Sequence, residues 1–158
     1  MVRSLRVRGS GAIIAGKYRL DTPIGVGGKG AVGLATDVDL GPAGAVKVVL
    51  GGTPPDESIA RFLREARSAA AVRHRNVVDV LDFGRDEAGA PYLVMEYLEG
   101  ESLDERIKRA PRPTLPEVAE WVAGALGGLA AIHDANIVHR DLKPSNILLD
   151  ASGNPKVA

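Results

Sequence analysis

Three side chains with complementary chemistry follow one another in a short loop between two apolar runs. The loop reads Ile137-Val-His-Arg-Asp-Leu-Lys-Pro-Ser-Asn-Ile-Leu-Leu149, and it carries Asp141, Lys143 and Asn146. A carboxylate can orient a hydroxyl, an ammonium group can neutralise a phosphoryl group, and an amide oxygen can hold a metal ion. An ordinary charged surface loop matches the composition but does not require this order of residues. The loop therefore predicts phosphoryl-transfer chemistry.

A glycine-rich stretch is the second candidate site. It runs Gly25-Val-Gly-Gly-Lys-Gly30 and continues into Ala31 and Val32. Glycines at this spacing let backbone amides approach phosphate groups closely, because no side chain intervenes. A dinucleotide-binding loop would be followed by a helix, whereas the residues up to Asp37 predict a strand. We interpret the stretch as a hairpin that covers nucleotide phosphates, with a flexible glycine-rich loop as the alternative.

Lys47 and Glu65 are candidates for an ion pair. Lys47 lies in the strand-like run 45–49, among apolar neighbours on both faces. Glu65 lies three residues after Phe62 in a helical pattern, on or beside the apolar stripe. A carboxylate in that position is costly unless a cation meets it. We expect the two side chains to pair; the alternatives are a lysine that faces solvent and a glutamate that reaches water from the edge of the stripe.

Strand patterns dominate the first part of the chain, and one helix interrupts them. Short strand-like runs broken by glycine fill residues 18–50, and two more strands are predicted over 77–83 and 92–97. Between them, helical spacing over 56–72 predicts an amphipathic helix. Its expected apolar stripe comprises Ile59, Phe62, Leu63, Ala66, Ala69 and Ala70.

After Gly100 the patterns become helical, so the chain as a whole is α+β. Ser102 with Glu105, and Thr114 with Glu117, are capping-box pairs that open a short helix and a longer one over 115–134. Three glycines inside the longer helix predict tight packing there, and Asn136 is a predicted left-handed stop. The expected apolar stripe of this helix is Val118, Val122, Leu126, Leu129 and Ile132, and its glycines are Gly124, Gly127 and Gly128.

Composition excludes several functional classes. The 158 residues carry 20 basic and 20 acidic side chains, so no net field favours nucleic acid or an acidic membrane surface. Without cysteine there are no disulfides, thiolate metal sites or cysteine nucleophiles, and the three histidines lack zinc-ligand spacing. The apolar stretch 12–15 is too short for a signal core, and no window approaches the roughly 20 apolar residues of a membrane helix. We expect a soluble, cytoplasmic chain.

Taken together, these motifs resemble the eukaryotic-type protein Ser/Thr kinases, in the style of their bacterial members. The string from His139 to Asn146 is similar to the catalytic loop of that family. Gly25–Val32 resembles its glycine-rich loop, Lys47 its strand lysine (with valine before it where isoleucine is usual), and Glu65 its helix glutamate. Met95-Glu-Tyr-Leu98 resembles the hinge. The resemblance extends over residues 12–158, with every element in family order.

The resemblance implies ATP and Mg²⁺ as cofactors and a protein bearing serine or threonine as substrate. Asp141 would orient the substrate hydroxyl, Lys143 would contact the γ-phosphate, and Asn146 would hold Mg²⁺. Lys47, paired with Glu65, would hold the α- and β-phosphates. The ATP-binding positions implied are Ile24, Gly25, Gly27, Gly28, Gly30, Val32, Ala45, Lys47, Met95, Glu96, Leu98 and Leu148.

The resemblance also implies a division of the chain into a lead (1–11), an N-lobe (12–98) and the start of a C-lobe (99–158). The family places an Asp-Phe-Gly metal motif roughly a dozen residues beyond the loop asparagine, and the chain ends before it. We therefore expect a truncated domain that is inactive alone and prone to self-association through uncovered helix surface. A non-catalytic nucleotide-binding or protein-binding fragment is the alternative, and a small-molecule kinase of the aminoglycoside phosphotransferase type is less favoured.

Overall fold

The computed structural model describes residues 11–27, 30–48 and 56–158, and gives side chains there except in 23–31 and 42–48. The chain forms two compact units, Met1–Arg67 with Val80–Tyr97, and Ser68–Asp79 with Leu98–Ala158. The boundary predicted at residue 98 lies beside the Tyr97–Leu98 junction, while Ser68–Asp79 contribute to the second unit.

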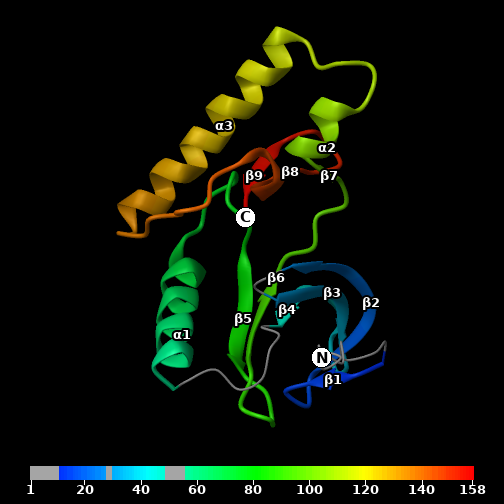
Figure 1. The fold of residues 1–158 in the computed structure, drawn as a ribbon, viewed down its shortest axis with the longest axis vertical. Coiled ribbons are helices and arrows are strands. Elements are labelled where there is room, and N and C mark those ends of the chain that lie inside the picture. Colours follow the sequence, from blue (N-terminus) through cyan, green and yellow to red (C-terminus); the bar gives the residue numbers. More distant parts are fainter. Residues whose placement is uncertain (1–10, 28–29, 49–55) are drawn as a thin grey trace, which may run out of the picture. The chain divides into compact units, whose positions relative to one another are not determined.

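The elements (Figure 1) are β1 (Ile13–Ile14), β2 (Tyr18–Gly27), β3 (Gly30–Asp37), β4 (Gly41–Val48), α1 (Asp56–Ala71), β5 (Val80–Arg85), β6 (Pro91–Met95), β7 (Glu101–Ser102), α2 (Leu103–Lys108), α3 (Leu115–Asp134), the 3₁₀ turn η1 (Pro144–Asn146), β8 (Ile147–Leu149) and β9 (Pro155–Val157).

The first unit is built on a six-stranded antiparallel sheet with the order β1-β2-β3-β4-β6-β5. Within it β2 and β3 form a hairpin, in which Val26 pairs with Ala31 and Gly27 with Gly30. The glycine-rich stretch therefore leads from strand to strand, as predicted, which excludes the dinucleotide-binding alternative because that loop needs a helix after it. Gly28, at the tip, lies outside the described residues.

An aromatic and ionic cluster stabilises one end of this sheet. Ile14, Tyr18, Ala35, Tyr92 and Val94 form a buried core, and the ring centroids of Tyr18 and Tyr92 lie 5.9 Å apart. The Tyr18 hydroxyl donates to Asp82 Oδ2 over 2.5 Å, and burial together with this bond raises the pKa of Tyr18 to about 12. The contact ties the start of β2 to the outer strand β5.

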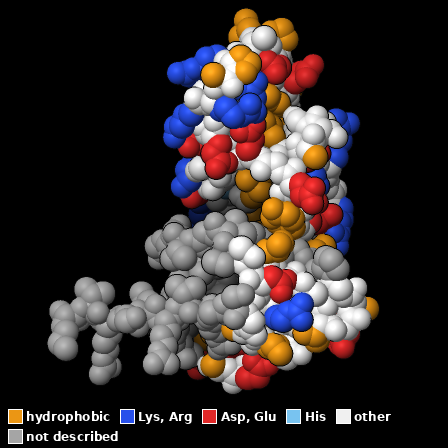
Figure 2. Space-filling model, turned by 90° about the vertical axis from the view of Figure 1, so that its right-hand side faces the viewer, with side chains coloured by type: hydrophobic (Ala, Val, Ile, Leu, Met, Phe, Trp, Pro, Cys, Tyr) orange, Lys and Arg blue, Asp and Glu red, His pale blue; other side chains and the backbone are white. Residues whose placement is uncertain are grey.

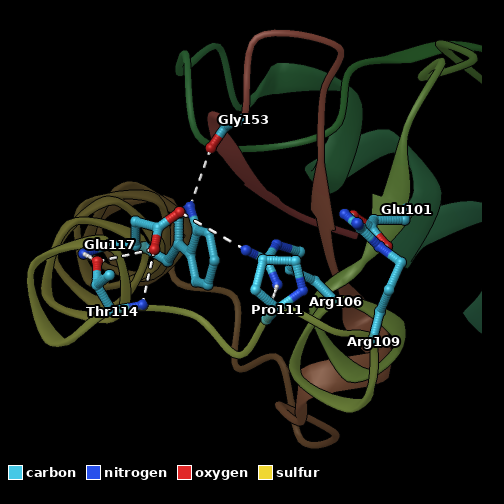
Figure 3. Close-up of polar contacts among 8 residues, drawn as sticks. Glu101, Arg106, Arg109, Pro111, Thr114, Glu117 and Gly153 are labelled. Atoms are coloured by element: carbon cyan, nitrogen blue, oxygen red, sulfur yellow. Dashed lines mark hydrogen bonds and ion pairs between the residues drawn. The ribbon is translucent and has the colours of Figure 1, made fainter.

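Both helices of the second unit begin at the predicted capping boxes. The Glu105 carboxylate accepts from Ser102 N at 2.7 Å, and Ser102 Oγ accepts from Glu105 N at 3.3 Å. Thr114 and Glu117 make the same reciprocal pair at the start of α3; Figure 3 shows it beside the contacts of Arg106. Because each box satisfies two otherwise unpaired backbone donors, the helix starts are fixed by sequence.

The buried face of α3 is offset from the predicted stripe. Of the predicted stripe, Ile132 is buried, whereas Val122 and Leu126 are 47% and 56% exposed, which agrees with the uncovered helix surface that the sequence predicts. The buried positions are Trp121, Ala125, Gly128 and Ile132. The helix turns this face inward because its glycines allow a closer approach than branched side chains do. A Cβ at Gly128 would lie 2.3 Å from the Asn76 carbonyl oxygen, and one at Gly124 would lie 2.5 Å from Pro155 Cγ.

The apolar composition of α3 is only partly explained by packing. By length and hydropathy it could cross a membrane, the one helix among the described residues that passes this weak test. Its buried face, however, packs on β9, and Trp121 Nε1 donates to the Gly153 carbonyl at 3.1 Å. The Arg106 guanidinium lies 5.6 Å from the centroid of the Trp121 ring. These contacts cover one face of α3, and 22% of its apolar window is buried.

Element ends mostly follow the predictions, with one clear exception. Asn136 has φ 59°, the predicted left-handed stop after α3. The strand predicted to begin at Val77 instead begins at Val80. Val77 and Val78 are diverted because they pair with the last strand, through a parallel bridge between Val77 and Val157 and a 2.8 Å bond from Val78 N to Val157 O. The two-residue strand β7 was not predicted.

Candidate active site

The loop between α3 and β8 brings its three predicted groups together. Lys143 Nζ lies 2.9 Å from Asp141 Oδ2. Asn146 Nδ2 donates to the Asp141 carbonyl at 2.7 Å and to Asp141 Oδ2 at 3.1 Å. A single carboxylate is thus held by an ammonium group and an amide, and all three belong to the second unit.

His139 anchors this loop, a role that sequence analysis did not assign. Its Nε2 lies 3.0 Å from the Ala158 carbonyl oxygen, and its Nδ1 accepts from Asp141 N at 3.3 Å. Because a carbonyl oxygen only accepts, Nε2 is the donor in this contact and Nδ1 is the acceptor. Ala158 N in turn donates to the Asn146 carbonyl at 3.0 Å. In the sequence, only the position of His139 two residues before Asp141 could have indicated this anchoring role.

The ion pair in the loop is open to solvent. The side chains of Asp141 and Lys143 are each 51% exposed, and exposed pairs contribute at most about 1 kcal/mol. A hydroxyl or a phosphate group can therefore displace Lys143 from Asp141 at small cost. The geometry suits a carboxylate that exchanges partners during a reaction.

Asn146 has the chemistry of a metal ligand. Its amide nitrogen is committed to Asp141, so the amide oxygen is the atom able to bind a cation. Magnesium takes a few side-chain oxygens together with phosphate oxygens and water, and the residues present fit that donor set. Among the described residues no group of three or more His, Cys, Asp or Glu forms a metal cluster.

In the first unit, backbone register brings several predicted ATP-binding positions next to one another. Val32 on β3 pairs with Lys47 on β4, and Lys47 pairs with Leu93 on β6. Ala45 on β4 pairs with Met95, the last residue of β6. Ile24, Gly25 and Gly27 lie in β2, and Gly30 opens β3. The side chains of the β2 and β4 positions fall outside the described part of the chain.

Glu65 has an exposed side chain in this structure. It lies on α1, whose buried residues are Ile59 and Ala66. Because the neighbouring Ala66 is buried, Glu65 lies at the edge of the buried face, which matches the alternative of a glutamate that reaches water from the edge of the stripe. The Lys47–Glu65 ion pair stays a prediction, since the Lys47 side chain is not described.

The remaining ATP-binding positions are distributed over both units. Met95 and Glu96 belong to the first unit and are half-buried. Leu98 and Leu148 belong to the second, where Leu148 lies on β8 and pairs with Ser102 and Lys156. A common nucleotide site formed by these residues stays a prediction.

Comparison with known proteins decides the family. A family model described as the protein kinase domain matches residues 18–158. The chain belongs to the protein kinase family. Its predicted kinase-like α+β fold is thereby confirmed.

Bacterial Ser/Thr kinases are among its relatives. The serine/threonine-protein kinase pkn3 of Myxococcus xanthus is 39% identical over 145 residues, which cover 91% of this chain and 26% of that protein. PrkC of Bacillus subtilis is 42% identical over 149 residues, covering 93% of this chain and 23% of that protein. The crystal structure of the Mycobacterium tuberculosis PknI kinase domain matches with a TM-score of 0.81 at 28% identity, over 95% of this chain and 60% of that one. This kinase chain therefore spans about a quarter of the length of those curated relatives.

Proposed function

We propose that this kinase segment binds Mg-ATP and supplies the groups that transfer the γ-phosphoryl to a serine or threonine of a protein. The observation that carries the proposal is the contact set of the catalytic loop, in which Asp141 accepts from both Lys143 and Asn146. Relatives named as Ser/Thr kinases support the class of acceptor. Because this reaction uses ATP, we place it in the cytoplasm.

Each loop group has one part in the proposed reaction. Bound ATP supplies the phosphoryl group, and Mg²⁺ neutralises phosphate charge. The Asp141 carboxylate accepts a hydrogen bond from the acceptor hydroxyl and orients its oxygen. Lys143, displaced from Asp141, neutralises charge on the transferring group. The amide oxygen of Asn146 holds the metal, while its amide nitrogen keeps Asp141 in place.

We also propose that a polypeptide of these 158 residues transfers phosphate slowly. Mg²⁺ in such sites is bound through one or two carboxylates in addition to phosphates, and the described residues offer no cluster of acidic ligands beside Asn146. A nucleotide-binding role without catalysis is the second candidate function of this polypeptide. Phosphate transfer to a generic Ser/Thr substrate separates the two: rapid transfer that Lys47→Met abolishes would contradict slow transfer.

Self-association of the same polypeptide is proposed through the solvent-facing side of α3. Leu115, Val122 and Leu126 are 81%, 47% and 56% exposed on that side, and contiguous apolar surface of this kind promotes association. Charges elsewhere are mixed: Figure 2 shows basic and acidic side chains interspersed on the viewed face, which gives no support for a nucleic-acid partner. Sedimentation over a concentration range would detect the association.

The proposed nucleotide site is tested by binding. Titration calorimetry with ATP, with and without Mg²⁺, is carried out on the unmodified chain, Lys47→Met and Asp141→Asn. We expect binding that Mg²⁺ strengthens, a loss of about tenfold or more in Lys47→Met from a missing charge-assisted phosphate contact, and near-normal affinity in Asp141→Asn. Equal affinity of all three proteins with no response to Mg²⁺ would refute the site.

A further inference from the structure

A buried asparagine links the segment before β5 to the strand that meets the catalytic loop. Asn76 is only 5% exposed. Its side-chain Nδ2 donates to the Pro155 carbonyl at 2.7 Å, and its own carbonyl accepts from Val157 N at 2.8 Å. Buried polar groups are costly unless they are paired, and here one residue satisfies both ends of β9. Asn76 therefore fixes where that strand lies.

Asn76 has no room to shift. A Cβ at Gly128 would lie 2.3 Å from the Asn76 carbonyl oxygen, and one at Gly124 would lie 3.1 Å from Asn76 Nδ2. The backbone of α3 thus packs directly against this residue as well as against β9. A neighbouring hydrogen bond, from Val78 N to Val157 O, also holds β9 in place. Interiors packed this closely transmit displacement instead of absorbing it.

The residue that follows β9, Ala158, is hydrogen-bonded to the catalytic loop. Ala158 N donates to the Asn146 carbonyl, and the Ala158 carbonyl accepts from His139 Nε2, both at 3.0 Å. His139 Nδ1 then receives the Asp141 amide at 3.3 Å. A continuous series of bonds therefore runs from Asn76 through β9 to the backbone of the metal-binding and base residues.

We propose that Asn76 is a positioning residue of the catalytic loop: by clamping β9 against α3, it holds Ala158 where His139 and Asn146 bind it. Its part in catalysis rests on the proposed function of Asp141 and Asn146. The clamp itself is a statement about hydrogen bonds, so it can be tested whether or not that function holds.

The test is Asn76→Asp in the 158-residue chain, because this isosteric change sets a carboxylate oxygen against the Pro155 carbonyl. Hydrogen exchange followed by NMR should show the amides of Val157, Ala158 and Asp141 losing at least about tenfold protection, the effect of one lost hydrogen bond. Amides in the middle of α3, which report global unfolding, should keep theirs. Asn136→Asp, at an exposed site, is the matched control and should change none of them.

ATP binding provides a second measurement: the effect of Mg²⁺ on ATP affinity should change only if Asn76 positions the catalytic loop. Asn76→Asp should lose at least half of the strengthening that Mg²⁺ gives to ATP affinity, while metal-free affinity stays within about twofold. If the unmodified chain binds no ATP, the proposed function fails and the clamp is judged by exchange alone. Loss of protection spread evenly over α3, or unchanged Ala158 and Asp141 amides, would overturn the clamp.

A measurement on the unmodified chain decides the case if Asn76→Asp does not fold. If Asn76 holds β9 in place, the amides of Val78, Val157 and Ala158 become exposed together, when β9 detaches. They should therefore exchange through one common opening event. Protection factors of these three amides should agree within about threefold. Ala158 exchanging more than about tenfold faster than Val157 would overturn the proposal, because the loop would then open without β9.

Discussion

Two neighbouring glycines in α3 should respond oppositely to the same substitution. A Cβ at Gly128 would meet the Asn76 carbonyl oxygen at 2.3 Å, whereas one at Gly127 would meet His74 Cε1 at 3.6 Å and Asn76 Oδ1 at 4.0 Å, which are ordinary contacts. Either change to alanine gains about 1 kcal/mol of helix propensity. Gly128→Ala alone adds overpacking, which costs about 1–3 kcal/mol. Propensity cancels in the comparison, so Gly127→Ala should be the more stable variant by about 1–3 kcal/mol.

The single tryptophan makes this measurable. Trp121 lies on the same helix and is buried, so its fluorescence during urea unfolding reports the second unit. We expect the unfolding midpoint of Gly127→Ala at or above that of the unmodified chain, and that of Gly128→Ala clearly below Gly127→Ala, with equal denaturant slopes. Equal midpoints for the two variants would refute the close approach of α3 to Asn76.

Three further changes test local contacts. Thr114→Ala removes the cap of α3 and should cost about 1 kcal/mol, measured by the same urea titration. Tyr18→Phe removes the hydroxyl bonded to Asp82 and should cost about 1–2 kcal/mol, seen in the first unit by thermal unfolding; an unchanged melting temperature would exclude the bond. Hydrogen bonds from Thr114 lower the pKa of Glu117, so this stabilisation is present above the unfolded pKa of 4.5 and is lost as pH falls through the folded value. Glu117→Gln should therefore flatten the loss of stability between about pH 5 and 3, and an unaltered slope would contradict the shift.

Local signals were sufficient for much of this fold. Both capping boxes, the left-handed Asn136 and the strand-to-strand glycine hairpin follow from residue types at short spacing. The cluster of Asp141, Lys143 and Asn146 was predictable for the same reason, because all three lie in one short loop.

Long-range packing was the part that sequence could not supply. The offset of the α3 face depends on Asn76 and Pro155, which are far from that helix in the chain. The diversion of Val77 from β5 depends on its pairing with Val157. Glu65 sits one position from the buried Ala66, and a periodic pattern does not resolve the edge of a helix face that finely.

The central claim is that Asp141 orients the acceptor hydroxyl, and one measurement tests it most directly. A hybrid domain would join residues 1–158 to the corresponding later segment of the PrkC kinase domain, and phosphate transfer to a Ser/Thr protein would be followed with and without Asp141→Asn. We predict a fall in turnover of about 10²–10⁴-fold, the contribution of a positioned base, with Mg-ATP affinity preserved. Turnover unchanged by Asp141→Asn in an active hybrid would contradict the account.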